Sequence, residues 1–78
     1  MARVVLYARD GCHLCDEARE VIERVRRTAA FTFIEIDIET DDALVRDYGI
    51  RIPVVAVDGE ELFEISVDPA ALRAAVEA

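Results

Sequence analysis

Residues 4–15 read Val4-Val5-Leu6-Tyr7-Ala8-Arg9-Asp10-Gly11-Cys12-His13-Leu14-Cys15. Their first four residues form an apolar run that ends at Arg9-Asp10-Gly11, a pattern typical of a central strand buried on both faces. Beyond Gly11, apolar residues recur at helical spacing with charges between them, and they predict an amphipathic helix from Cys12 to Arg27. This stretch therefore predicts a strand that leads through a short loop into a helix carrying two cysteines.

The segment Phe31–Ile38 alternates between apolar and polar side chains, as a half-buried strand does. We expect its isoleucines to face the core and Glu35 and Asp37 to face solvent. Because a helix connects this strand to the first one, the two are expected to be parallel neighbours joined by a right-handed crossover.

The second half of the chain predicts a short helix, a hairpin and a final helix. Asp-Gly between two strand-like runs is the strongest short-range hairpin signal, and Asp68-Pro69 gives an N-cap followed by proline at the first helical position. The expected elements are a helix over Ala43–Tyr48 capped by Thr40-Asp41-Asp42 and ended by Gly49, strands over Val54–Val57 and Glu60–Ile65, and a helix over Ala70–Ala78.

The predicted order is βαβαββα, an α/β fold with a four-stranded mixed sheet flanked by helices. The 78 residues are too few for a second core, so residues 1–78 are expected to form a single domain. A hydrophobic share of 54% is too high for a disordered chain.

Composition excludes several classes of function. The net charge of −8 argues against nucleic acid as a partner, since such affinity depends on neutralising phosphates. The chain contains no lysine, which excludes lysine Schiff-base and lysine-base chemistry. Its one histidine, His13, and its one serine, Ser66, lie in unrelated contexts, which argues against a Ser-His-Asp triad.

The two cysteines are the main candidates for chemistry. No segment approaches the length of a membrane span, and the N-terminal sequence lacks the pattern of a signal peptide, so we expect no membrane partner and a cytoplasmic location. Cysteines in that compartment are kept reduced, so a pair is more often used for chemistry than as a structural staple.

Cys12 and Cys15 are three residues apart at the predicted start of the helix, where a disulfide can form without moving the backbone. The positive end of the helix should lower the pKa of Cys12 and make it the nucleophile. Cys15 lies on the apolar stripe, so it should be the more buried, resolving thiol. The two alternatives are a zinc site, for which Cys12, His13 and Cys15 supply too few ligands, and two unrelated buried cysteines.

Two cations could tune this pair. His13, if protonated, would stabilise a Cys12 thiolate, whereas a neutral imidazole would do little. Arg9 is a permanent cation three residues before Cys12, suited to the same task or to binding an anionic substrate; otherwise it is a solvated surface arginine. Asp10 and Asp16 flank the site and would oppose thiolate formation unless they cap the helix.

The chain resembles the thioredoxin superfamily, and within it the glutaredoxin-like proteins. Residues 4–15 resemble the start of a glutaredoxin, in which a strand is followed by a basic residue and then by C-x-x-C. The segment with the family's cis-proline is similar to Tyr48-Gly49-Ile50-Arg51-Ile52-Pro53-Val54-Val55. The resemblance implies a thioredoxin-like fold, a cis Pro53 facing the redox pair, and an Ile52 backbone that pairs with an extended substrate or with the cysteine of glutathione.

One departure concerns glutathione. Glutaredoxins usually carry a Gly-Gly pair and an acidic residue after the hairpin, whereas this chain reads Leu62-Phe63-Glu64-Ile65-Ser66-Val67-Asp68. Phe63 and Glu64 would crowd the backbone approach that the glycines permit. Ser66 or Asp68 would remain to meet the glutathione amine.

The resulting prediction is a monomeric dithiol thiol-disulfide oxidoreductase with no permanently bound cofactor or metal. Cys12 attacks a mixed disulfide of a protein or of glutathione, and Cys15 resolves it. Electrons come from glutathione as a co-substrate or, in a redoxin-type alternative, from thioredoxin reductase. Two further alternatives are an iron-sulfur carrier, in which Cys12 of two chains and two glutathiones hold a cluster, and a redox-inactive binding module.

Overall fold

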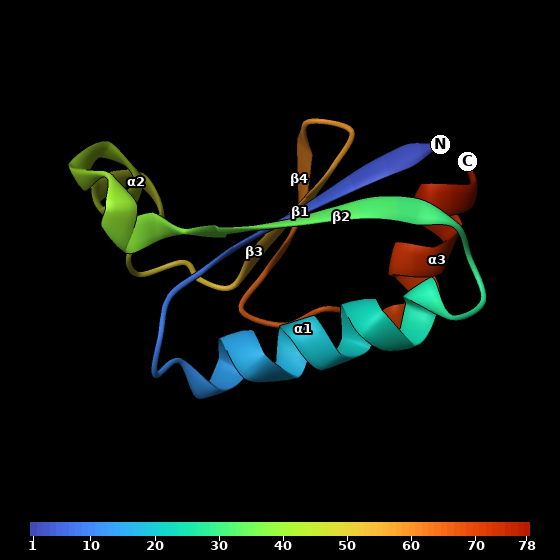
Figure 1. Ribbon diagram of the computed structural model, residues 1–78, viewed down its shortest axis with the longest axis horizontal. Coiled ribbons are helices and arrows are strands. Elements are labelled where there is room, and N and C mark those ends of the chain that lie inside the picture. The colour runs from blue at the N-terminus through green and yellow to red at the C-terminus, as the bar shows by residue number, and fades with distance from the viewer.

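The structure is a computed structural model that describes residues 1–78 (Figure 1). Its elements follow the predicted order, with one 3-10 helix, η1, added after the second strand. Their bounds are β1 Ala2–Ala8, α1 His13–Arg26, β2 Phe31–Asp37, η1 Ile38–Thr40, α2 Asp42–Tyr48, β3 Val54–Val57, β4 Glu60–Glu64 and α3 Pro69–Glu77. The predicted α/β fold is confirmed.

The four strands form one mixed sheet in the order β2-β1-β3-β4. β1 is parallel to β2 and β3 is antiparallel to β4, as the sequence predicts. The structure adds that β3 is also antiparallel to β1. Tyr7 near the end of β1 pairs with Val54 at the start of β3. The loop after β1 and the segment before β3 therefore meet at the same end of the sheet.

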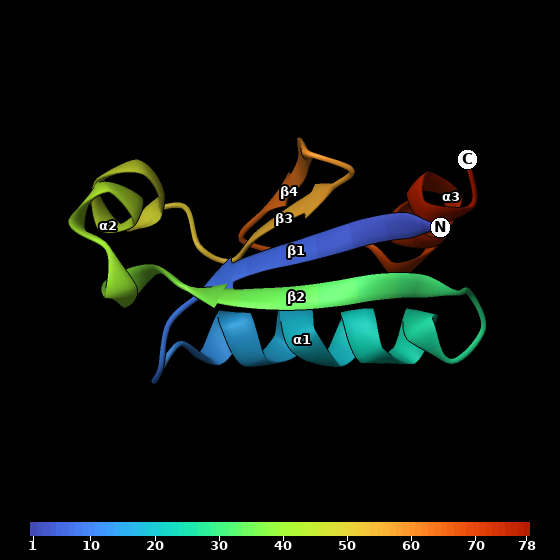
Figure 2. The same cartoon turned by 45° about the horizontal axis from the view of Figure 1, so that its top comes forward.

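The long helix α1 runs along one face of the sheet, as Figure 2 shows, and α3 packs against both α1 and β1. Between them lies the main core, to which β1 contributes Val4, Leu6 and Ala8. α2 lies beyond the ends of β1 and β2 in both views (Figures 1 and 2). None of the three helices has the length and apolar composition needed to cross a membrane.

The assignment of faces in β2 was wrong. Glu35 pairs with the buried Leu6, on the side of the sheet that α1 covers, and its carboxylate binds Arg19 of α1 at 2.6 Å. Ile34 faces the other side and is 39% exposed, because α1 and α3 both pack on the Glu35 side. For the same reason β1 is central but not buried on both faces: Val5 and Tyr7 are only half-buried.

The turn and capping residues that the sequence predicts lie at the expected positions. The Asp58-Gly59 turn has positive φ at both residues, 52° and 87°, and closes the predicted hairpin. Asp41 caps α2, since its Oδ1 accepts a hydrogen bond of 2.8 Å from the Ala43 amide. Asp68 occupies the N-cap position of α3, but its side chain makes no capping hydrogen bond, contrary to the usual behaviour of that residue.

Candidate functional site

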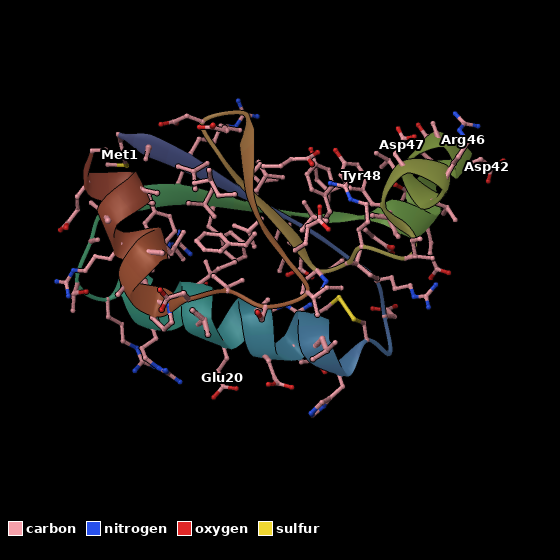
Figure 3. All side chains as sticks on the ribbon, turned by 180° about the vertical axis from the view of Figure 1, so that it is seen from behind. Met1, Glu20, Asp42, Arg46, Asp47 and Tyr48 are labelled. Atoms are coloured by element: carbon pink, nitrogen blue, oxygen red, sulfur yellow. A yellow bond between two sulfur atoms is a disulfide. The ribbon has the colours of Figure 1, made fainter.

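Cys12 and Cys15 form a disulfide at the start of α1, with their Cα atoms 5.2 Å apart. It is the yellow bond at the blue end of α1 in Figure 3. Cys12 is the N-cap residue, in an extended conformation, and its side chain is half-buried. Cys15 is fully buried in the core, so the predicted difference in burial between the two sulfurs is present.

The polypeptide itself provides a donor for the Cys12 sulfur. The Cys15 amide donates a hydrogen bond of 3.2 Å to Sγ of Cys12. This amide belongs to the first turn of α1, whose free N–H groups carry the positive end of the helix dipole. A donor and a dipole of this kind are the features that stabilise a cysteine thiolate at a helix N-terminus.

The Ile52-Pro53 peptide bond is cis, as the resemblance implied. Pro53 is fully buried and precedes Val54, the partner of Tyr7, so it lies at the end of the sheet where β1 leads toward Cys12. The Ile52 amide already donates to the carbonyl oxygen of Tyr48 at 3.1 Å, whereas no hydrogen bond reaches the Ile52 carbonyl oxygen. Strand-like pairing with a substrate is therefore limited to that oxygen in this structure.

The two predicted tuning cations lie at the surface. The side chain of His13 is 87% exposed, and its Nε2 lies 3.2 Å from Oε2 of Glu17, one turn along α1. Arg9 is exposed and makes no ion pair or side-chain hydrogen bond, so it is available to an anionic group in a substrate.

The segment after the hairpin has no glycine and is packed. Phe63 is partly buried against the core, and Glu64 accepts a hydrogen bond of 3.2 Å from Nε of Arg51. Ser66 and Asp68, the two residues left to meet a glutathione amine, are exposed. Ile65, which directly precedes Ser66, has a φ of 70°, a conformation that is rare for a β-branched residue.

An aromatic and charged cluster packs the end of α2 onto β1 and β4. Tyr48, labelled in Figure 3, stacks on Tyr7 with ring centroids 4.2 Å apart. The Arg51 guanidinium lies over the Tyr48 ring and binds Glu61, which also accepts a hydrogen bond of 3.0 Å from the Tyr48 hydroxyl. Burial raises the pKa of Tyr48, and the bond to Glu61 raises it further. The hydrogen bond from Arg51 lowers the pKa of Glu61.

The structure also contains a small hollow between α1 and the segment after β4 that sequence reasoning missed. Its walls include Leu14, which lies between the cysteines, and Ile65. Leu14 could have been found from its place in the C-x-x-C segment, but nothing in the sequence indicates that Ile65 adopts a positive φ. No group of three or more His, Cys, Asp or Glu side chains is arranged to hold a metal ion.

Comparison with known proteins agrees with this geometry. A family model described as Glutaredoxin-like domain (DUF836) matches residues 3–77. An uncharacterized protein of Mycobacterium tuberculosis (strain ATCC 25618 / H37Rv) is 31% identical, over 92% of this chain and 79% of the relative.

Solved structures show the same architecture. A structural-genomics target protein from X. campestris is 42% identical with a TM-score of 0.77, covering 91% of each chain. A protein from Nitrosomonas europaea is 28% identical with a TM-score of 0.82, covering 96% of this chain and 91% of the other. A thioredoxin mutant from Halobacterium salinarum is 26% identical with a TM-score of 0.71, covering 97% of this chain and 72% of the other.

The fold and the cysteine pair at the start of α1 define a thioredoxin-superfamily protein. Within that superfamily, the chain belongs to the glutaredoxin-like domain family, whose model spans nearly all of it. The fold and the C-x-x-C pair together support a redox role.

Proposed function

We propose that this chain is a dithiol thiol-disulfide oxidoreductase of a reducing, cytoplasmic compartment. The observation that carries the proposal is the asymmetry of the cysteine pair. Cys12 is half-buried and accepts a backbone hydrogen bond at its sulfur, whereas Cys15 is fully buried directly beneath the first turn. The first thiol suits attack on an external disulfide, and the second suits resolution.

The cycle begins with both cysteines reduced. The Cys12 thiolate attacks one sulfur of a substrate disulfide, forms a mixed disulfide and expels the other substrate sulfur as a thiolate, which takes up a proton. Cys15 then loses its proton and attacks Sγ of Cys12, which releases the second substrate thiol and forms the Cys12–Cys15 disulfide seen here. Two electrons and two protons pass to the substrate, and an external thiol or a reductase must return them.

The segment after β4 favours a protein reductase over glutathione as the source of those electrons. Phe63 is packed against the core and Glu64 is held by Arg51, so neither leaves the open backbone that a glycine pair provides. Glutathione would meet Ser66 or Asp68 only through side chains. We therefore propose, as an alternative form of the same function that this segment favours, a redoxin-type reaction in which thioredoxin reductase rather than glutathione recharges the cysteine pair.

A redox titration of the Cys12–Cys15 pair tests the proposal. The reduced and oxidised chains are separated by mass spectrometry after equilibration in glutathione buffers and in dithiothreitol buffers. A reversible two-electron couple is expected, and a transient glutathione adduct on Cys12 would identify a glutathione-linked enzyme. The couple without that adduct would favour the reductase-linked form, and no couple at all would leave a binding module.

A further inference from the structure

Arg51, the residue before Ile52, binds two elements of the fold at once. Its Nε and Nη2 donate hydrogen bonds of 3.2 and 3.1 Å to Oε2 of Glu64, and its Nη2 also donates to Glu61. Both glutamates belong to β4. On the other side, Nη1 donates to the carbonyl oxygen of Asp47 in α2, labelled in Figure 3, at 3.1 Å. The guanidinium therefore joins the end of α2 to an edge strand of the sheet.

The segment between α2 and Pro53 has few other attachments. Ile50 is 96% exposed, so its side chain adds no packing. The amides of Arg51 and Ile52 both donate to the carbonyl oxygen of Tyr48, at 2.8 and 3.1 Å, and these two bonds fix the segment to α2 only. Arg51 carries the one polar side chain between Tyr48 and Pro53, so it makes the side-chain hydrogen bonds that tie this segment to β4.

The Ile52 carbonyl oxygen depends on this link for its position. Ile52 is buried, its amide is used within the fold, and its carbonyl oxygen has no hydrogen-bond partner in the chain. The next carbonyl oxygen, that of Pro53, accepts a hydrogen bond of 2.8 Å from the Ile65 amide. One backbone acceptor is therefore left beside Pro53 for a substrate. Because no second bond is present to compensate for a displacement, the placement of this oxygen matters for the reaction.

We propose that Arg51 is a positioning residue: by binding two carboxylates of β4, it holds the Ile52 carbonyl oxygen where this oxygen accepts a hydrogen bond from a backbone N–H of an extended polypeptide substrate. The inference rests on the proposed function and deepens it, since none of the hydrogen bonds of Arg51 reaches either cysteine. Glu61 and Glu64 project from the same face of the sheet. Without the guanidinium, two like charges would lie beside the segment and repel each other, so the segment would shift.

Stopped-flow kinetics on two disulfides test this role. One is a blocked Gly-Cys-Gly peptide whose cysteine forms a disulfide with thionitrobenzoate. The other is the symmetric disulfide of thionitrobenzoate, which has no peptide backbone. The Cys12 thiolate attacks either disulfide, forms a mixed disulfide and releases coloured thionitrobenzoate, the better leaving group. Only the peptide can donate a backbone N–H to Ile52, so the ratio of the two rates reports that hydrogen bond.

Arg51→Ala removes the link. We expect the peptide rate to fall about tenfold, within the loss of about 10²-fold that a misplacement of about 1 Å can cause. The rate with the symmetric disulfide should stay close to that of the parent chain, because the Cys12 sulfur keeps its backbone donor and its helix dipole. Arg51→Lys keeps the charge but loses the planar fork, so it should recover only part of the peptide rate. Arg46→Ala is the matched control: it removes an equal charge from an α2 residue that makes no ion pair, and should leave both rates unchanged.

The substrate donor can be removed as well. Two further peptides carry an N-methyl group on the backbone nitrogen of the cysteine or of the glycine after it. With the parent chain, the peptide that has lost the donating N–H should react about tenfold more slowly, because the same hydrogen bond is missing. Arg51→Ala should slow that peptide no further, since the bond that Arg51 positions is already absent.

Glu64→Ala covers the case in which Arg51→Ala does not fold. It changes an exposed residue, removes two of the four side-chain hydrogen bonds of Arg51, and should slow the peptide reaction alone. Equal losses on both disulfides, an unchanged peptide rate, or N-methyl peptides that react like the parent peptide would overturn the positioning role while leaving the oxidoreductase intact. No thionitrobenzoate release by the parent chain from either disulfide would instead overturn the proposed function, and the positioning role with it.

Discussion

The amide of Cys15 donates a hydrogen bond to the sulfur of Cys12, 3.2 Å away, within the first turn of α1. The two residues of the redox pair are therefore unequal in the folded chain before any substrate binds. One sulfur is at the edge of the helix with a donor directed at it, and the other is sealed in the core between α1 and the sheet. This inequality leads to the first prediction.

The two single cysteine-to-serine variants should differ in whether they accumulate a mixed disulfide with substrate. Cys15→Ser should accumulate a mixed disulfide with substrate, because nothing remains to resolve it. Cys12→Ser should form no adduct, because the buried Cys15 sulfur cannot reach a substrate. Mass spectrometry after incubation with a peptide disulfide detects the adduct, and the double variant is the control. An adduct on Cys15 in the Cys12→Ser chain would reverse the assigned roles.

The cluster at Glu61 predicts a loss of stability in acid. The hydrogen bond from Arg51, and then that from Tyr48, lowers the pKa of Glu61 in the folded chain. A lowered folded-state pKa adds stability that is complete above the unfolded value of about 4.3 and is lost as pH falls through the folded value.

Urea unfolding of the parent chain and of Glu61→Gln checks this. We expect the parent to have the higher midpoint at pH 6 and the difference to disappear toward pH 3. Glu60→Gln changes the neighbouring exposed carboxylate, which makes no ion pair, and should show no such pH-dependent difference. A difference for Glu61→Gln that is constant across this range would contradict the coupling.

The order of elements was readable from the sequence because each local signal agreed with the next. The apolar run before Gly11, the helical stripe behind Cys12 and the Asp58-Gly59 turn each determine one element without help from distant residues. The faces of β2 were not readable in this way. Alternation separates the two sides of a strand, but only the packing of α1 decides which side is covered. Glu35 can lie on the covered side because Arg19 of α1 donates hydrogen bonds to its carboxylate.

The candidate site was likewise predictable only in part from the sequence. Cys12 and Cys15 are marked by residue type and spacing, whereas the cis conformation of Pro53 followed only from the resemblance of its segment to a known family. The contact of His13 with Glu17 and the position of Ile65 depend on side-chain and backbone geometry that no pattern specifies. The Tyr7–Tyr48 stack joins residues far apart in the chain and could be known only from the fold.

Gly49 provides a test of the turn that leads to Ile52. Its φ is −50°, which any residue can adopt, so alanine would ordinarily stabilise the chain by about 0.4–1 kcal/mol. A Cβ at this position would lie 2.5 Å from the backbone carbonyl oxygen of Val45, however, and must displace it. We therefore expect Gly49→Ala to destabilise the chain by about 1 kcal/mol in urea unfolding. A raised midpoint would mean that the turn relaxes without cost.

The orientation of β2 can be tested by truncating one residue on each of its faces. Phe31 is buried on the side that α1 covers, so Phe31→Ala should destabilise the chain by about 3–5 kcal/mol, the range for a large buried side chain. Ile34 is partly exposed on the other side, and Ile34→Ala should cost about 1 kcal/mol or less. Denaturant unfolding of the two variants measures both costs. A larger loss from Ile34→Ala would place the isoleucine side against the core, because the cost of truncation follows the burial of the side chain.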